Sequence, residues 1–261
     1  MQNCEQQMEG QDMITKEELR SYASRTGLNL GQAELDYFQN IILFILYKEY
    51  GNEIVFKGGT AMKKCFGLDR FSEDLDFSCS KSIDAKNLAN GLKRFRLDFE
   101  MQKDEFDDGM KITLRLKGPL YNGTQNSVCR FIIDFSFREN VMLKPVVKSI
   151  GRYMYETPAF DVFVMQEEEI LAEKVRAIMS REKARDVYDM RFLIEKGVRF
   201  DSVLVKKKLE YYNDEWDPKE FETRIEAKRV IWNSELKPLI SAVPDFSEAK
   251  GAIMRATKMR K

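Results

Sequence analysis

The feature that most constrains this chain is a glycine turn followed closely by two aspartates in an apolar strand. Residues 56–62 read Phe-Lys-Gly-Gly-Thr-Ala-Met, and residues 74–78 read Asp-Leu-Asp-Phe-Ser. Because side chains alternate across a strand, Asp74 and Asp76 are expected on one face. Neighbouring carboxylates repel each other unless a cation lies between them, and Mg²⁺ takes such oxygen ligands while keeping room for substrate phosphates. The pair predicts a metal site, with a solvated strand face as the alternative.

The glycine turn predicts the second part of such a site. Gly58, Gly59 and Thr60 begin a helix, where free backbone N–H groups can bind a phosphate. The alternative for Thr60 is an ordinary N-cap, and both roles are compatible. The spacing is not that of a Walker A loop. Lys57, directly before the turn, is either part of the phosphate site or a surface lysine. Turn and carboxylates together predict a nucleotide-transfer site.

A further carboxylate lies inside a later apolar strand. Asp134 stands in Phe-Ile-Ile-Asp-Phe, residues 131–135. Burying an unpaired carboxylate is costly, so this side chain needs a partner or a metal. The functional interpretation is a third metal ligand, placed beside the first two aspartates by strand pairing. The structural alternative is a buried ion pair with Arg130 or Arg138.

Histidine is absent from all 261 residues. Its absence excludes Ser-His-Asp and Cys-His catalysis, His-ligated zinc and metalloproteases with an H-E-x-x-H motif. Acid–base chemistry must therefore fall to carboxylates, lysine or tyrosine. Metal-assisted phosphoryl chemistry is compatible with this composition, because positioning and electrostatics supply most of its catalysis.

Charge and cysteine content predict a soluble cytoplasmic protein with no membrane partner. The 43 basic and 43 acidic residues cancel, so net charge gives no indication of nucleic-acid binding. The four cysteines are widely spaced, which argues against disulfides or a zinc site and fits a reducing cytoplasm. The apolar run at residues 41–47 is too short to span a bilayer, and the polar N-terminus is unlike a signal peptide.

The hydrophobic period changes along the chain from mixed strands and helices to helices alone. The first part is expected to contain a helix after a capping box at residues 15–18, helices at 29–50, 60–66 and 84–104, and strands at 54–56, 74–79, 110–117, 128–137, 141–150 and 160–165. Helices are expected at 167–179, 183–196, 201–212 and 218–236, followed by a basic tail or helix at 249–261. This order predicts an α+β catalytic domain over residues 1–166 and a helical domain over 167–261.

Basic runs in the second half are open to two interpretations. They comprise Lys206 to Lys208, Lys228 with Arg229, and the terminal residues 258–261. Such runs are usually solvated helix faces, and they indicate an RNA-binding surface only if they converge on the catalytic site.

Two blocks of sequence resemble a known family. The first contains residues 57–61 and 67–77. The second reads Glu-Lys-Val-Arg-Ala at 173–177 and Arg-x-Lys-Ala-Arg-Asp-Val-Tyr-Asp at 181–189. In this order they resemble the AbiEii/AbiGii nucleotidyltransferase toxins of type IV toxin–antitoxin, or abortive-infection, systems. The resemblance implies a nucleotidyltransferase-like mixed sheet with flanking helices, and a helical second domain that completes the active-site cleft.

The resemblance also implies roles for individual residues. Asp74 and Asp76 would hold two Mg²⁺ ions, and Asp134 would complete the metal site and help deprotonate the attacking hydroxyl. In the second block, Lys174 would contact the triphosphate, Asp186 would steady that lysine or line the nucleotide pocket, and Arg185 would join the nucleotide-binding residues.

The reaction implied is transfer of a nucleotide from a nucleoside triphosphate to an acceptor, with release of pyrophosphate. The family implies an RNA acceptor, with the 3′ end of tRNA as one candidate, and a cognate antitoxin as a partner. Two alternatives share the same motifs. One is a nucleotidyltransferase acting on a protein or a small molecule, and the other is a nucleotide-binding regulator without turnover.

Overall fold

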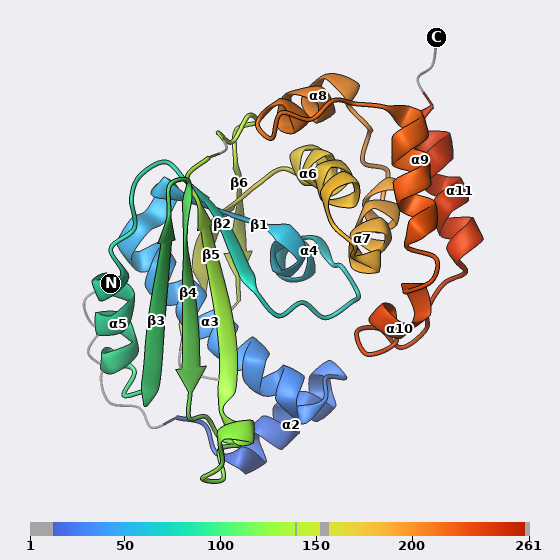
Figure 1. The fold of residues 1–261 in the computed structure, drawn as a ribbon. Coiled ribbons are helices and arrows are strands. Elements are labelled where there is room, and N and C mark those ends of the chain that lie inside the picture. The colour runs from blue at the N-terminus through green and yellow to red at the C-terminus, as the bar shows by residue number, and fades with distance from the viewer. Residues whose placement is uncertain (1–12, 139, 152–156, 259–261) are drawn as a thin grey trace. The chain divides into compact units, whose positions relative to one another are not determined.

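The computed structural model describes residues 13–138, 140–151 and 157–258, and in these residues seven strands form one mixed sheet (Figure 1). The strands are β1 (Ile54–Lys57), β2 (Leu75–Cys79), β3 (Phe99–Phe106), β4 (Gly109–Leu116), β5 (Cys129–Ser136), β6 (Val146–Ile150) and β7 (Phe160–Val164). Their order is β3-β4-β5-β2-β1-β7-β6. The pairs β2–β5 and β1–β7 are parallel and the other neighbours are antiparallel. The predicted α+β class is confirmed.

The α-helices precede, interrupt and follow these strands. They are α2 (Lys16–Thr26), α3 (Leu30–Tyr50), α4 (Gly58–Phe66), α5 (Ala85–Arg94), α6 (Glu167–Ser180), α7 (Ala184–Glu195), α8 (Ser202–Glu210), α9 (Pro218–Ala227), α10 (Trp232–Leu236) and α11 (Phe246–Thr257). Short 3₁₀ turns, η1 (Gly51–Glu53) and η2 (Gln125–Ser127), precede β1 and β5. No described helix is long and apolar enough to cross a membrane.

Local sequence explains where the first helices begin. Thr15 and Asn29 each accept a hydrogen bond from the backbone N–H three residues ahead, and the side chains there return a bond to the cap's own N–H. These capping boxes satisfy donors that have no partner inside the helix. The box at Thr15 confirms the prediction for that segment.

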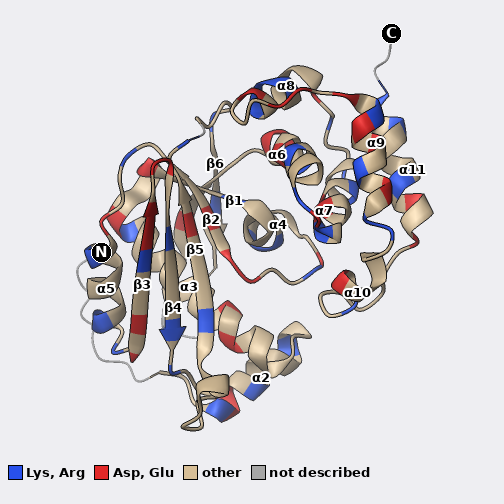
Figure 2. Cartoon of the chain, viewed as in Figure 1, with Lys and Arg blue, Asp and Glu red and all other residues tan. Residues whose placement is uncertain are grey.

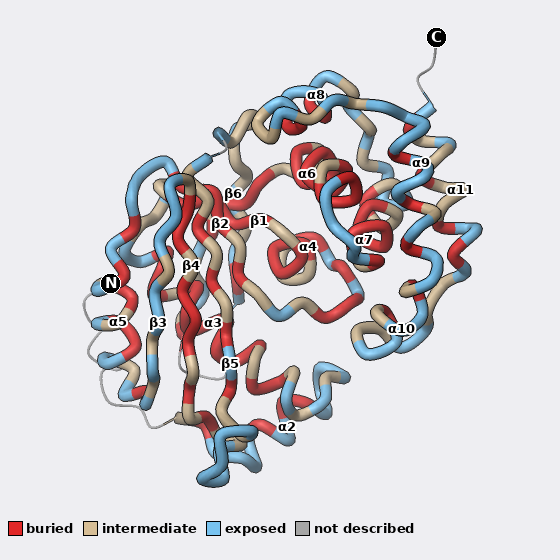
Figure 3. The backbone as a smooth tube through the Cα atoms, viewed as in Figure 1, coloured by how far each residue is buried: buried red, intermediate tan, exposed pale blue. Residues whose placement is uncertain are grey.

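The two faces of the sheet differ in chemistry. Phe56, Phe77 and Phe135 from adjacent strands stack in a row, with ring centroids 5.4 Å apart in each pair. Helix α3 packs against β5 and β7, and its Tyr47 ring lies 6.3 Å from Phe77. Burying each such aromatic or aliphatic side chain contributes about 1.5–3 kcal/mol. In Figure 3 the buried backbone runs along the central strands and α3. One face of the sheet is therefore core, and the alternate residues lie on the other.

One predicted helix is wrong in its second half. The segment expected as a helix over 84–104 forms α5 only to Arg94, and residues 99–106 are the edge strand β3. Arg96 adopts a positive φ of 52°, which ends the helix. Phe99 to Phe106 then pairs along its whole length with β4. Long-range pairing with β4 overrides the local helical pattern.

The helix expected over 218–236 is divided into α9 and α10, and the basic C-terminal segment forms α11 as far as Thr257. Residues 259–261 lie outside the described part of the chain. The strand predicted at 141–150 begins only at Val146. In these segments the predicted type of secondary structure is right, and only the ends of the elements differ.

The chain divides into two compact units. The first contains residues 1–65, 73–140 and 146–164, and the second contains 66–72, 141–145 and 165–261. The second unit therefore takes two short segments from the region assigned by sequence to the first domain. One of these, residues 66–72, directly precedes Glu73 and Asp74.

Candidate active site

A row of charged side chains crosses five strands of the sheet. Pairing places Asp104, Lys111, Asp134, Asp76 and Lys57 next to one another on β3, β4, β5, β2 and β1. Residues in register across a sheet share a face, so the row lies opposite the stacked phenylalanines. Figure 2 shows acidic and basic residues along these strands. Asp76 and Asp134 are direct neighbours, as the sequence predicts.

Asp74 stands immediately before β2. Leu75, between the two aspartates of the motif, is fully buried, whereas Asp74 and Asp76 are half-buried. The Thr60 hydroxyl donates a hydrogen bond of 2.5 Å to the Asp74 carbonyl oxygen. Gln39 Nε2 donates to the Glu73 carbonyl at 3.0 Å. Side chains from α4 and α3 therefore hold the backbone at this point.

Gly58 begins α4 against the carboxylate of Asp76. Its φ is +75°, in the left-handed region that favours glycine. A Cβ at this position would lie 2.3 Å from Asp76 Oδ2. Glycine is therefore favoured at position 58 for two reasons, the left-handed backbone conformation and the close approach of the Asp76 carboxylate. The helix start also places positive dipole potential beside that negative charge.

Asp134 does not form the ion pairs proposed as its structural alternative. Arg138 pairs with Asp108 instead. Neither a hydrogen bond nor an ion pair joins Asp134 to another described residue. Its carboxylate is half-buried beside Asp76. Lys111 and Lys57 flank the two aspartates in the row, and repulsion between the adjacent carboxylates favours a further cation beside them.

The donor set fits a hard divalent cation. Asp74, Asp76 and Asp134 supply oxygen ligands only, and Gly58 leaves space at Asp76 that a side chain would fill. Over the described residues, no three acidic or cysteine side chains are gathered closely enough to hold a metal together. Mg²⁺ commonly uses one or two protein carboxylates and completes its shell with substrate phosphates and water. Such a site suits ions that arrive with a nucleotide.

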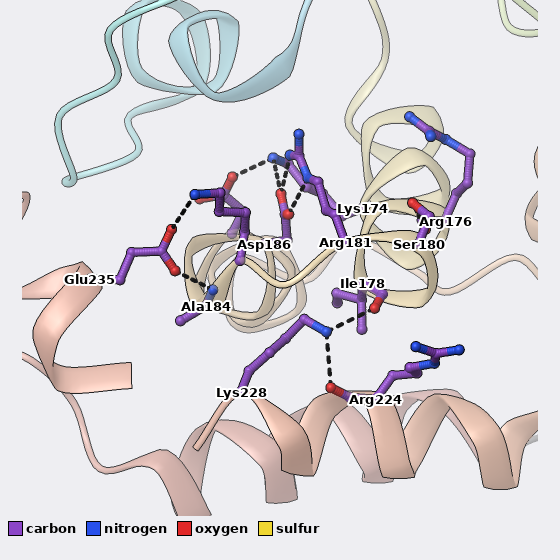
Figure 4. A network of polar contacts seen from close by, with 12 residues as sticks. Lys174, Arg176, Ile178, Ser180, Arg181, Ala184, Asp186, Arg224, Lys228 and Glu235 are labelled. Carbon is purple, nitrogen blue, oxygen red and sulfur yellow. Dashed lines mark hydrogen bonds and ion pairs between the residues drawn. The ribbon is translucent and has the colours of Figure 1, made fainter. Parts of the chain in front are cut away.

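The second unit contains a buried network of ion pairs (Figure 4). Lys174 Nζ lies 3.0 Å from Asp186 Oδ1 and 2.6 Å from Asp189 Oδ2. Arg70 binds Asp189 through Nε and Nη2 at 2.5 and 2.7 Å. Arg181 binds Asp186 through two nitrogens, both at 2.7 Å. Three cations therefore surround two carboxylates, and the half-exposed Arg181 lies at the edge of the network.

These cations determine the ionisation of the two aspartates. Burial alone would raise the pKa of Asp186, but Lys174 and Arg181 outweigh it and hold that pKa well below its usual range. Burial likewise opposes ionisation of Asp189, and Arg70 with Lys174 lowers its pKa. Both carboxylates are therefore charged at neutral pH.

Arg70 and Asp189 are not among the site residues predicted from the sequence. Their positions in the motif blocks could have indicated a role. Arg70 stands in Asp-Arg-Phe-Ser of the first block, and Asp189 ends Arg-Asp-Val-Tyr-Asp of the second. Arg185 was predicted from the sequence to bind nucleotide. It is half-buried and forms no hydrogen bond or ion pair with another described residue. Tyr188, on the same helix, donates to Asp69 at 2.6 Å.

Two lysines of the basic runs are interior. Lys208 is fully buried and lies 2.7 Å from Glu169 and 3.1 Å from Glu173. Lys228 is also buried and donates to the carbonyls of Ile178 and Arg224 at 2.9 and 3.0 Å (Figure 4). Burial lowers the pKa of Lys228. Neither contributes to a basic surface.

The predicted residues fall in both units. Lys57, Gly58, Gly59, Thr60, Asp74, Asp76 and Asp134 belong to the first, and Lys174, Arg185 and Asp186 belong to the second. Within the first unit the structure places Gly58 against the Asp76 carboxylate, pairs Asp76 with Asp134, and joins Thr60 to the backbone of Asp74. Within the second it brings Lys174 and Asp186 into contact.

Solved structures provide an independent comparison of the fold. MenT4, a nucleotidyltransferase toxin from Mycobacterium tuberculosis, matches with a TM-score of 0.67 and 21% identity, over 94% of this chain and 89% of that one. JHP933 from Helicobacter pylori matches with a TM-score of 0.54 and 20% identity, over 85% of this chain and 88% of that one. No curated protein sequence matches.

The model of the family described as nucleotidyl transferase AbiEii toxin, type IV toxin–antitoxin system, matches residues 42–253. This range includes the glycine turn, the carboxylate strands and the Lys174 network. The chain therefore belongs to the AbiEii family of nucleotidyltransferase toxins.

Proposed function

We propose that this nucleotidyltransferase is a toxin that transfers a nucleotide from a nucleoside triphosphate to RNA, releasing pyrophosphate. The observation that carries the proposal is the pairing of Asp76 with Asp134 on the sheet face where Gly58 begins α4. Carboxylates next to a helix start supply both halves of a site for a metal-bound triphosphate. The 3′ end of tRNA is one candidate for the acceptor, and an antitoxin is the expected protein partner.

The first unit would bind and orient the reacting groups. Asp74 and Asp76, with Asp134, would hold two Mg²⁺ ions, which neutralise charge on the phosphates when bound. Backbone N–H groups of Gly59 and Thr60, with Lys57, would bind phosphate oxygens. The acceptor hydroxyl would attack the α-phosphorus as Asp134 accepts its proton. The bond to the β-phosphate bridging oxygen would break, and pyrophosphate would leave.

In the second unit, Lys174 would supply positive charge to the triphosphate. Its ammonium group is held by Asp186 and Asp189, which also bind Arg181 and Arg70, and this fixed position supports the role. Asp186 and Asp189 would act as positioning residues that hold the ammonium group. Arg185 would contribute a further nucleotide contact. Free thiols at Cys65, Cys79 and Cys129 are compatible with action in the reducing cytoplasm.

The test is incubation of the purified protein with each α-labelled nucleoside triphosphate, Mg²⁺ and total cellular RNA, beside Asp74→Ala. Label in RNA that depends on Asp74 supports the proposal and identifies the nucleotide. Metal-dependent nucleotide binding without labelled RNA would instead support a protein or small-molecule acceptor. Nucleotide binding without transfer to any acceptor would favour a regulator without turnover, and absence of nucleotide binding would overturn the proposal.

A further inference from the structure

Two arginines stand opposite each other on the sheet. Arg115 of β4 is the register partner of Arg130 on β5. Directly opposed residues of an antiparallel pair have Cβ atoms about 4.5–5.5 Å apart, and like charges at such positions are destabilising. The fold therefore places two guanidinium groups together at a cost in stability.

Neither arginine forms an ion pair within the described part of the chain. Arg115 and Arg130 form no hydrogen bond or ion pair with another described residue. Glu100, the partner of Arg115 on β3, also forms none with it. Lys117 is paired with Asp98 at 2.8 Å and Arg138 with Asp108. Lys111 of β4 forms no hydrogen bond or ion pair either, but its register partners are Asp104 and Asp134, whereas each of the two arginines has another arginine opposite it.

The pair shares a face with the catalytic carboxylates. Arg130 and Asp134 are four residues apart on β5, so their side chains lie on the same face. Side chains alternate along β5, and Phe131 and Ile133, which lie between the two, are buried on the opposite face. At about 3.3 Å per residue, Arg130 lies roughly 13 Å from Asp134 along the strand. Four stacked nucleotides cover about that distance.

On β4 and β5 the intervening row carries no charge. Ile132 and Thr113 are register partners between the arginines and the pair Asp134–Lys111. An acceptor strand extending from the carboxylates would meet no acidic side chain on β4 or β5 before it reached the arginines. Guanidinium groups bind phosphates through two parallel hydrogen bonds, so two adjacent arginines suit a phosphodiester backbone.

We infer that Arg115 and Arg130 form a phosphate-binding subsite for the RNA acceptor, upstream of the nucleotide that receives the transfer. This inference rests on the proposed RNA acceptor. It assigns acceptor binding to the sheet itself rather than to the basic runs of the second half, in which Lys208 and Lys228 are buried.

The test is binding of a short fluorescent single-stranded RNA, measured by anisotropy over a series of salt concentrations. The variants are R115Q/R130Q and the control K93Q/R94Q, which removes two exposed charges from the last turn of α5. Loss of two charge-assisted contacts should weaken binding by about tenfold to a hundredfold or more. The slope of log affinity against log salt should fall by about 0.7 per phosphate contact.

The control should bind RNA as the wild type does, and all three proteins should bind labelled nucleoside triphosphate equally. R115K/R130K should retain most of the salt dependence, because it keeps the charges. Wild-type affinity in R115Q/R130Q, an equal loss in K93Q/R94Q, or no RNA binding by the wild type would each overturn the inference.

The same proteins separate this inference from the proposed function. Transfer of label to RNA with unchanged RNA affinity in R115Q/R130Q would leave the transferase intact and remove the subsite. RNA binding that depends on the two arginines, without any label transfer, would keep the subsite and remove the transferase.

Discussion

In the first unit, Asp76 and Asp134 stand beside each other on neighbouring strands, whereas each buried aspartate of the Lys174 network in the second unit contacts two cations. Asp76 and the five residues of the Lys174 network lie in the two motif blocks, whereas Asp134 lies outside them. The first arrangement places two adjacent carboxylates on one face of the sheet, between Lys111 and Lys57 of the same row, and the second surrounds its buried carboxylates with three cations. The first is therefore suited to bind a ligand, and the second to maintain the fold around Lys174. Substitutions should separate these roles into loss of activity and loss of stability.

The largest effect is expected from Asp76→Asn. Removing a metal ligand should lower nucleotide transfer about a thousandfold or more. The free energy of unfolding should fall less than in Asp189→Asn, because Asp76 is half-buried and the amide remains polar. Label transfer and urea denaturation measure the two quantities. Asp104→Asn, at the far end of the same row, is the control and should keep its activity. Transfer above a tenth of the wild-type rate in Asp76→Asn would contradict the metal role.

Asp189→Asn should show the opposite behaviour. The substitution leaves Arg70 and Lys174 buried with one charge fewer to balance them. Breaking a buried pair in this way costs about 3–5 kcal/mol. Urea denaturation should show the loss in unfolding free energy, whereas Glu195→Gln on the same helix should lose about 0.5 kcal/mol or less. Equal stability of the two variants would show that the network does not maintain the fold.

Gly58→Ala tests the contact between the turn and the carboxylate. The added methyl meets the end of the Asp76 side chain, which can rotate away, so the main effect should be on catalysis. A displacement of about 1 Å can lower the rate a hundredfold. Gly27→Ala is the matched control, because its φ is +70° and nothing lies within 4 Å of the new Cβ. Both variants should lose about 1–2 kcal/mol of stability from the left-handed backbone. If the two keep equal transfer rates, the close approach at Gly58 has no catalytic role.

The smallest effect is an acid dependence of stability. Asp186 and Asp189 have lower pKa values in the folded chain than their usual value of about 3.9. Their contribution is therefore complete above about pH 4 and is lost as pH falls through the folded-state values. Urea denaturation of the wild type should show stability falling below pH 4, and Asp189→Asn should show a shallower fall. If the unfolding free energy fell equally steeply with pH in both proteins, Asp189 would not contribute to the acid dependence.

The sequence alone determined the local elements of this protein. Capping at Thr15, the glycine turn at residues 58–59 and strict alternation around Leu75 depend on residues close together in the chain. The carboxylates and the motif blocks, with the absence of histidine, were also enough to predict the family and its chemistry. Such signals can be read locally because periodicity and turn chemistry act within a few residues.

Tertiary structure alone decided which distant residues meet. The sequence did not reveal that residues 99–106 form an edge strand, that Asp189 binds Arg70, or that Lys208 and Lys228 are interior. Nor did it reveal that Arg115 faces Arg130. Strand register and the partners of buried charges depend on contacts between segments far apart in the chain. No local pattern encodes these contacts, because their free energy arises only when both segments are in place.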